Sequence, residues 1–290
     1  MTGRTRPLAT GGMARFTPLV LLALLSLPGR AEAQAGNQNR TVTVNYVYAS
    51  QIGIGGYDLS GLSVQVFTLP LAHTFDLGSE GGWRLKLKLP VELGVYEFHA
   101  TDTDGTRISI RQQALAIVPG LELQIPLGPQ WTLKPFADFG VGKLLQAPGT
   151  PAYIFSTGIK SAYTVRRGVY AFTIGNGLLF AGDASFGRAD LEDYWAIENG
   201  IEIRRPLGLE FRGVEPDLGV YAIYYYYPKP LVFTRFLEDP LKISNQGEIG
   251  FSLGSASRLD LPVVGNPRIG VGYVFGGGLS VLRVSFGFPF

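Results

Sequence analysis

Apolar and polar residues alternate with a period of two along most of this chain. The clearest segment runs from Trp83 to Leu93, where every odd position is apolar and four of the five even positions are charged. Successive side chains of an extended strand point to opposite faces. The segment therefore predicts a β-strand with one apolar and one charged face. The same alternation recurs over 114–127, 131–141 and 195–204.

The alternation predicts an all-β fold of about twelve strands, within a range of roughly 10–14. The strands are expected near 41–53, 61–72, 83–96, 108–127, 131–145, 152–165, 168–180, 193–205, 217–228, 246–255, 267–276 and 279–290. Short, turn-like connectors such as 128–130 roughly alternate with longer polar ones such as 181–193. Short turns at one end and long loops at the other are typical of a closed antiparallel transmembrane β-barrel. A secreted β-sandwich is the alternative.

Two features of the strand faces favour the barrel over the sandwich. Aromatic residues that prefer membrane–water interfaces gather near the ends of the apolar faces: Trp83, Trp131, Tyr153, Tyr163, Tyr170, Trp195 and Tyr224 to Tyr227. The opposite faces carry charges, as the inside of a barrel does. Eight are basic (Arg84, Lys86, Lys88, Lys134, Lys160, Arg204, Arg268, Arg283) and six acidic (Glu92, Glu122, Asp138, Glu198, Glu202, Glu248).

Residues 1–33 have the pattern of a secretory signal peptide, which leaves 34–290 as one barrel domain. Basic residues precede an apolar run from Phe16 to Leu27, and Ala31-Glu32-Ala33 predicts cleavage before Gln34. An uncleaved membrane anchor is the alternative, but the apolar run falls short of the ~20 residues that span a bilayer. The segment holds four Arg and one Glu, so the net charge of +2 becomes −1 without it.

Composition excludes several functional classes. The chain has no Cys, which excludes disulfides, thiolate zinc sites and cysteine nucleophiles. Its small net charge argues against nucleic acid as a partner. Beyond residue 33 no run of 18 apolar residues exists, so a helical membrane protein is excluded. We expect no cofactor and no metal.

The last ten residues, VLRVSFGFPF, resemble the C-terminal signal of bacterial outer-membrane β-barrel proteins. In that family the final strand ends in an aromatic residue with apolar residues at every second position before it. Here these positions are Val284, Phe286, Phe288 and Phe290. The resemblance implies export through the inner membrane to the bacterial outer membrane. It also implies partners: outer-membrane lipid and lipopolysaccharide, the barrel-assembly machinery and periplasmic chaperones.

A narrower resemblance is to the translocator barrel of autotransporters. Twelve strands, a terminal Phe and the segment Val118 to Lys143 are similar to that group. Only Gln34 to Arg40 precede the first expected strand. Seven residues are too few for a passenger or for the helix that threads the pore in that family. The resemblance therefore implies a solitary barrel without a passenger.

The charged inner face is the candidate functional site. An ~8-stranded barrel is filled by side chains and a 16-stranded porin is open, so about twelve strands allow a filled bore or a narrow pore. Arg84, Lys86 and Lys88 either pair with Glu92 and Glu122 or line water and favour anions. The predicted cluster of inner-face charges is Arg84, Lys86, Lys88, Glu92, Glu122, Lys134, Asp138, Glu198, Glu202 and Arg204. We expect a narrow passive pore or transport-type barrel for small solutes, with a non-conducting structural or surface-interaction barrel as the alternative.

An enzyme is not expected. A hydrolase at the outer rim remains a weaker alternative, because His99 precedes Asp102 and Asp104 closely. No Gly-x-Ser-x-Gly motif supplies a nucleophile. The largest expected outer loop, Pro228 to Asn245, carries apolar residues that favour packing into the bore, over the mouth or against a partner. An ordinary surface loop is the other interpretation.

Overall fold

The computed structural model describes residues 48, 54–59, 62–78, 81–101, 107–145, 151–187, 191–210, 214–233, 240–255, 268–286 and 290. The predicted signal peptide and its cleavage site lie outside these residues. The strands are β1 (Ile54–Leu59), β2 (Leu62–Asp76), β3 (Arg84–Thr101), β4 (Arg107–Ile117), β5 (Gly120–Pro126), β6 (Trp131–Leu144), β7 (Ala152–Arg167), β8 (Tyr170–Ser185), β9 (Leu191–Pro206), β10 (Pro216–Phe233), β11 (Leu241–Ser255), β12 (Ile269–Gly276) and β13 (Leu279–Phe286).

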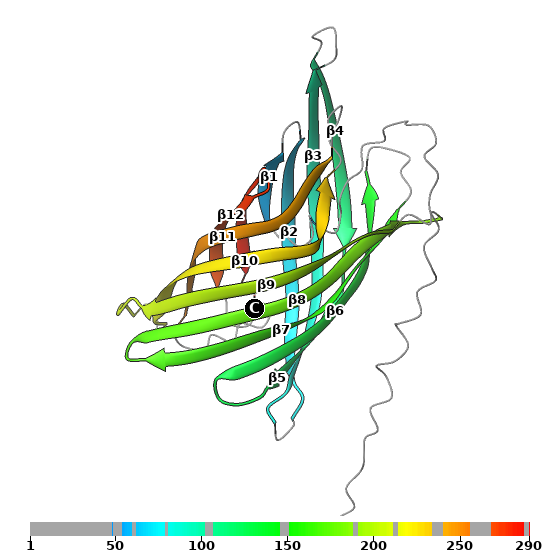
Figure 1. Ribbon diagram of the computed structural model, residues 1–290. Helices are drawn as coiled ribbons and strands as arrows, with labels where there is room; N and C mark the ends of the chain where they lie inside the picture. The colour runs from blue at the N-terminus through cyan, green and yellow to red at the C-terminus, as the bar shows by residue number, and fades with distance from the viewer. Residues whose placement is uncertain are drawn as a thin grey trace, which may run out of the picture. The chain divides into compact units, whose positions relative to one another are not determined.

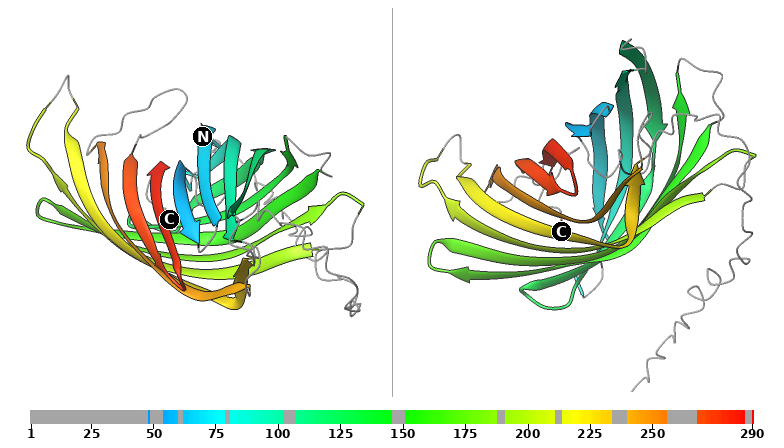
Figure 2. Two further views of the ribbon diagram at one scale, coloured as in Figure 1. Left: turned by 90° about the horizontal axis from the view of Figure 1, so that it is seen from above. Right: turned by 45° about the horizontal axis from the view of Figure 1, so that its top comes forward.

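The strands form one closed antiparallel barrel (Figure 1). The ring closes because β1 pairs with both β13 and β2, and β2 pairs in turn with β3. The strands β4 and β5 share one position in the wall, since both pair with β3 on one side and β6 on the other. The thirteen strands therefore occupy twelve positions, and the predicted fold class is confirmed. Figure 2 shows the curved wall from two further sides.

Burial alternates along most of the strands and separates the two faces, most regularly on β8 to β12. On β9, Ala196, Glu198 and Glu202 are buried, whereas Ile197 and Ile201 are 38% and 56% exposed. The apolar half of the strand thus faces outward and the polar half inward, the reverse of a water-soluble protein. Among the described residues, no helix is both long and apolar enough to cross a membrane.

Three prolines lie close together on neighbouring strands. Pro70 on β2 and Pro90 on β3 are direct cross-strand partners. Pro119 stands between β4 and β5 and accepts a hydrogen bond of 2.9 Å from the Phe139 N–H. A proline has no N–H to donate to a strand ladder. Pro119 therefore interrupts the ladder between the end of β4 at Ile117 and the start of β5 at Gly120. A hollow of about 770 Å³ adjoins this place, lined mainly by outward-facing residues such as Leu121.

The prediction for the first strand is wrong. The structure places β1 at Ile54–Leu59, and Tyr48, inside the predicted strand 41–53, has a helical backbone. The rest of 41–53 lies outside the described residues. Gly55 and Gly56 suggested a turn, but Gly55 packs against β13, where a Cβ would lie 2.5 Å from the Leu282 oxygen. The first described strand therefore begins after the predicted segment 41–53 and not within it.

The predicted loop from Pro228 to Asn245 is also mostly strand. β10 continues to Phe233 and β11 begins at Leu241, while 234–239 lie outside the described residues. The pairing with β11 shifts between Tyr226 and Leu231. Bulges tolerate prolines that regular ladders exclude, so Pro228 and Pro230 bend the strand without ending it.

Candidate functional site

The inner face carries two groups of charged residues on opposite parts of the wall. We call the first the lysine wall. It lies on β3, β5, β6 and β7 and consists of Arg84, Lys86, Lys88, Glu92, Glu122, Lys134, Asp138 and Lys160. We call the second the cross-linked wall. It lies on β9 to β13, with Arg268 just before β12, and consists of Glu202, Arg204, Asp217, Glu248, Ser252, Arg268 and Arg283.

Two of the three acids of the lysine wall, Asp138 and Glu122, lie beside its bases. Lys88 forms an ion pair of 2.6 Å with Asp138, and Lys86 lies directly across from Glu122 in the β3–β5 ladder. Lys134 and Lys160 are themselves cross-strand partners. Like charges directly opposite each other repel, and each lysine turns to another group. Lys160 lies 3.9 Å from Glu198 on β9, and Lys134 donates to the main-chain oxygen of Phe290 at 2.8 Å.

An aromatic ring separates two of these lysines. The ammonium groups of Lys88 and Lys160 lie 5.0 and 5.6 Å from the centre of the Phe136 ring. Both distances suit a cation–π attraction. The ring itself lies on Gly158, where a Cβ would come within 2.9 Å of it. Glycine at this inward position lets a large ring lie flat against the wall.

Glu248 is at the centre of the first half of the cross-linked wall. Its carboxylate accepts hydrogen bonds from Arg283 at 2.9 and 2.7 Å, from Tyr221 at 3.0 Å and from Tyr225 at 2.6 Å. Arg283 also donates to the Tyr225 hydroxyl oxygen at 3.0 Å. A buried carboxylate is stable only when its oxygens are satisfied. Four donor groups from two strands, β10 and β13, meet that condition for Glu248.

Arg268 is at the centre of the second half. Its guanidinium group pairs with Asp217 and donates to the Ser252 hydroxyl at 2.8 Å. That hydroxyl donates in turn to Glu202 at 2.7 Å. Arg204 approaches the other oxygen of Glu202 at 3.3 Å. The network therefore joins β9, β10 and β11 through paired charges.

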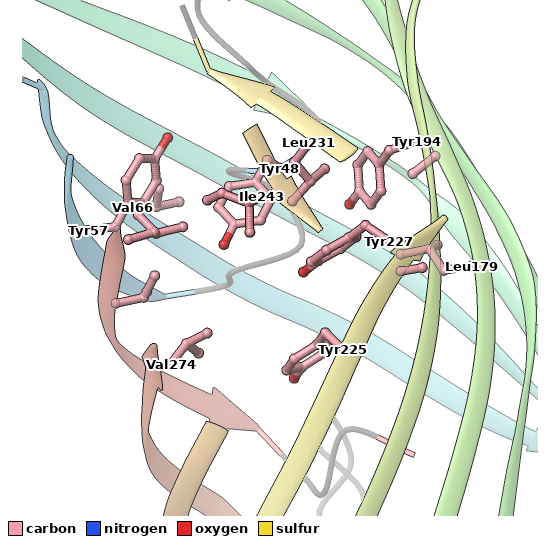
Figure 3. Packing of buried hydrophobic residues seen from close by; sticks show 14 of the residues in the cluster. Tyr48, Tyr57, Val66, Leu179, Tyr194, Tyr225, Tyr227, Leu231, Ile243 and Val274 are labelled. Atoms are coloured by element: carbon pink, nitrogen blue, oxygen red, sulfur yellow. The ribbon is translucent and has the colours of Figure 1, made fainter. Parts of the chain in front are cut away.

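A cluster of buried tyrosines packs inside the barrel (Figure 3). The ring of Tyr48 packs edge-on against Tyr57 and Phe233, with ring centres 5.8 and 5.0 Å apart. The hydroxyls of Tyr48 and Tyr227 both donate to the side-chain oxygen of Gln246, at 3.2 and 2.7 Å. The cluster therefore joins a residue preceding β1 to β10 and β11.

The aromatic run at Tyr224 to Tyr227 is divided between the two faces. Tyr224 and Tyr226 are exposed on the outer face, but Tyr225 and Tyr227 are 8% and 5% exposed and face inward. The prediction that the whole run lies on the apolar outer face is wrong for these two. The physical reason is the alternation itself, because neighbouring residues of a strand cannot share a face.

The structure places the ten predicted charges on the inward-facing positions of their strands. It brings together Lys88 with Asp138, Lys86 with Glu122, and Arg204 with Glu202. Glu92 is buried at 5% exposure on β3. Arg84 lies across from Gln124 and not from an acid. Any role of these residues in transport remains a prediction.

Several buried polar residues were absent from the predicted cluster. They are Asp183, Asp217, Tyr221, Tyr225, Gln246 and Ser252. The sequence did contain a signal for some of them. Asp217, Tyr221 and Tyr225 occupy odd positions of β10, whereas the outward apolar residues Leu218 and Val220 occupy even positions, so the three odd residues had to face inward. Gln246 and Ser252 carry the same signal on β11, where they lie on the face opposite the outward apolar residues Ile249 and Phe251.

The residues of the proposed C-terminal signal do not share one face. β13 ends at Phe286, which is 45% exposed on the outer face, and Val284 precedes it by two positions. Phe288 lies outside the described residues. Phe290 is only 5% exposed and belongs to the buried core. The prediction that alternation continues to the last residue is wrong, and recognition by assembly machinery remains a prediction.

Neither an enzymatic site nor a metal centre emerges from the described residues. His99 lies on β3, but its side chain and residues 102–106 are outside the description, so the rim hydrolase stays untested. Within the described part of the chain, no three His, Asp or Glu side chains gather closely enough to hold a metal ion.

Comparison with solved structures identifies the fold. The chain is similar to the translocator domain of the autotransporter NalP from Neisseria meningitidis, with a TM-score of 0.55 and 14% identity over 81% of this chain and 85% of that one. A second likeness is to the NanC porin, with a TM-score of 0.34 and 13% identity over 81% of this chain and 98% of that one. A TM-score this low adds nothing to the assignment.

No family model matches the sequence. No curated protein matches it either. The likeness to the NalP translocator domain, at 14% identity, therefore establishes the barrel fold alone.

Proposed function

We propose that this protein spans the bacterial outer membrane and that its bore is a narrow pore for small, mainly anionic solutes. The outer face supports the membrane location. Large apolar side chains are exposed around the whole barrel, including Phe139 at 59%, Phe251 at 62% and Leu282 at 61%. Such a continuous apolar surface is stable in lipid and not in water. Export by residues 1–33 and delivery by the assembly machinery are part of the same proposal.

The unequal burial of the inner charges carries the pore proposal. The Lys88 and Lys160 side chains remain 24% and 25% exposed although both face inward. In the cross-linked wall, the bases Arg268 and Arg283 are 9% and 12% exposed, and only Arg204, at 22%, is as exposed as the lysines. An exposed inward ammonium group is stable where water reaches it. We infer that the lysine wall borders water, while the opposite wall is drier around Arg268 and Arg283.

The charge of the lysine wall supports a preference for anions. It contains five basic and three acidic side chains. Lys160 is partly compensated by Glu198 from β9, which leaves an excess of positive charge along the wet side. A ring or wall of basic groups attracts anions and repels cations in a narrow pore.

A non-conducting barrel is the second candidate, and one specific observation favours it. Phe290 and the tyrosine cluster occupy part of the bore. If together they close it completely, the protein would serve as a structural or surface-interaction barrel in the manner of a solitary autotransporter barrel.

Single-channel recording in planar bilayers separates the two candidates. Folded, purified protein is expected to give small, discrete current steps with an anion-selective reversal potential. Replacing Arg84, Lys86 and Lys88 together by Gln should move that potential toward zero. Lys143→Gln, on the outward side of β6, is the matched control and should leave it unchanged. An unchanged potential in the triple variant contradicts the role of the lysine wall, and absence of current from folded protein favours the non-conducting barrel.

A further inference from the structure

Phe290 lies inside the barrel and outside the strand ladder. β13 ends four residues earlier at Phe286, yet the Phe290 side chain is only 5% exposed. The mark of the C-terminus lies over β8 and β9 in Figure 1. If β13 continued regularly to residue 290, Phe290 would face outward together with Leu282 and Phe286, which have the same parity. Its ring contacts β8 and β9 instead.

Three glycines form the surface on which the ring lies. Gly175 and Gly200 are direct partners in the β8–β9 ladder, and both face inward. A Cβ on Gly200 would lie 2.5 Å from Cε2 of Phe290, and one on Gly175 would lie 2.7 Å from its Cβ. Gly177 flanks the ring at 3.5 Å. We call these three residues the glycine cradle. Any larger side chain at Gly175 or Gly200 would occupy the volume of the ring.

A cation lies at the edge of the cradle. Lys134 on β6 donates to the main-chain oxygen of Phe290 at 2.8 Å. Lys160, the cross-strand partner of Lys134, adds a second positive charge and is itself paired with Glu198. An oxygen that carries negative charge is bound more strongly by an ammonium group than a neutral one. The pocket thus holds two features together, a flat ring and, a few bonds away, an oxygen that accepts a hydrogen bond from an ammonium group.

Other inward glycines of this barrel are covered differently. Phe136 covers Gly158 from β6, and Tyr221 covers Gly250 from β10; each ring is fixed by its own strand. Phe290 is not held by a strand. Glycine positions at which a chain or ligand approaches the wall closely are a known feature of binding sites.

We propose that the glycine cradle and Lys134 form a binding site in the bore for an aromatic ring carrying a carboxylate or similar oxyanion, and that Phe290 of the same chain fills this site as a plug. The plugging role rests on the proposed pore, whereas the binding site does not. Without Phe290, small aromatic carboxylates enter the cradle from the wet side. With it, the bore is narrowed beside β6 to β9.

Cross-linking tests the position of Phe290 first. The chain has no Cys, so a Gly175→Cys, Phe290→Cys pair is free of background. The two Cβ atoms are close enough for a disulfide after a small shift. Mild oxidation of the folded full-length protein should protect both thiols from maleimide labelling. The control pair, Leu282→Cys with Phe290→Cys, should stay labelled, because Leu282 faces outward. Full labelling of the first pair overturns the placement.

Ligand titration tests the site itself. The Phe290→Ala chain, refolded from urea into detergent so that the assembly machinery is not needed, is titrated calorimetrically with 3-phenylpropanoate. Acetate, which lacks the ring, and 2-phenylethylamine, which lacks the anion, are expected to bind at least about tenfold more weakly. Adding Lys134→Gln to the Phe290→Ala chain should weaken the binding of 3-phenylpropanoate by at least about tenfold. Adding Gly200→Leu, which fills the cradle, should abolish binding.

The outcomes are distinguishable from failure of the pore proposal. Binding by folded Phe290→Ala protein but not by the unsubstituted chain supports the site, whether or not the barrel conducts. Equal binding by both chains, or none by a folded Phe290→Ala chain, overturns it. If the barrel conducts, Phe290→Ala should pass more current than the unsubstituted chain, and 3-phenylpropanoate should reduce that current.

Discussion

Arg283 on β13 reaches across β12 to Glu248 on β11 and donates to both oxygens of its carboxylate, at 2.9 and 2.7 Å. Ladder hydrogen bonds join only neighbouring strands, so this pair ties together strands that the ladder does not join directly. Neither partner is on the surface, since the Glu248 side chain is completely buried and that of Arg283 is 12% exposed. The pair is therefore an internal brace of the barrel.

Removing one member of this brace should be costly. Arg283→Met leaves the Glu248 carboxylate buried without its partner, and we expect a loss of about 3–5 kcal/mol in the free energy of unfolding. Urea unfolding in lipid vesicles, followed by tryptophan fluorescence, measures it. The control is Arg111→Met, which breaks a pair with Glu97 whose side chains are 60% and 38% exposed, and should cost about 0–1 kcal/mol. Equal losses would contradict the brace.

Gly272 should not tolerate a methyl group. A Cβ at this position would collide with the Glu248 carboxylate and the Tyr221 hydroxyl, and Gly272 is the cross-strand partner of Arg283. Gly272→Ala is expected to cost about 1–3 kcal/mol through overpacking. Gly56→Ala is the control, because its Cβ would meet nothing nearer than 3.5 Å. A neutral Gly272→Ala variant, judged by the same urea titration, would contradict the packing described here.

The outer face should reject charge. Ile201 is 56% exposed on β9, and Arg at a lipid-facing position near the middle of a membrane costs about 2–4 kcal/mol. We expect that loss for Ile201→Arg when folding is measured in vesicles. Ile201→Val should be nearly neutral. If Ile201→Arg costs nothing in vesicles, this face does not lie in lipid and the membrane proposal fails.

Tyr48 should stabilise the barrel from inside. Tyr48→Ala empties space beside Tyr57 and Phe233, and removal of a large buried aromatic side chain costs about 3–5 kcal/mol. Tyr48→Phe loses only the hydrogen bond to Gln246, about 1 kcal/mol. Thermal unfolding monitored by circular dichroism ranks the two variants. If Tyr48→Ala were as stable as the unsubstituted chain, the residue would not be part of the core.

The period-two pattern was sufficient to predict most of this fold. Segments such as 131–141 expose one apolar face to the outside and one polar face to the inside, so each position in the sequence dictates a face. The closed ring followed from the number of such segments and from the connector lengths. The register between neighbouring strands could not be predicted from the pattern, because sliding one strand by two or four residues leaves the same side chains on each face.

The errors occurred where local signals compete with tertiary packing. Gly55 has the composition of a turn, but a close approach to β13 explains the glycine. Pro228 and Pro230 have the composition of a loop end, yet a bulge accommodates them. In the candidate site, charges at regular parity were predictable. The position of Phe290 was not, because its contacts with Gly175 and Gly200 join parts of the chain far apart in sequence.

The three prolines near the β4–β5 interruption have a mechanical consequence. Pro70, Pro90 and Pro119 lack donors on neighbouring strands beside a hollow of about 770 Å³, while β9 to β13 are braced by side chains across the ladder. The barrel is therefore expected to be stiff along one part of its circumference and compliant along the other. In bilayers of different thickness, amide exchange should change first around Pro90 and last around Glu248. The compliant part includes the lysine wall, so the surrounding lipid would adjust the width of the bore from the side that borders water.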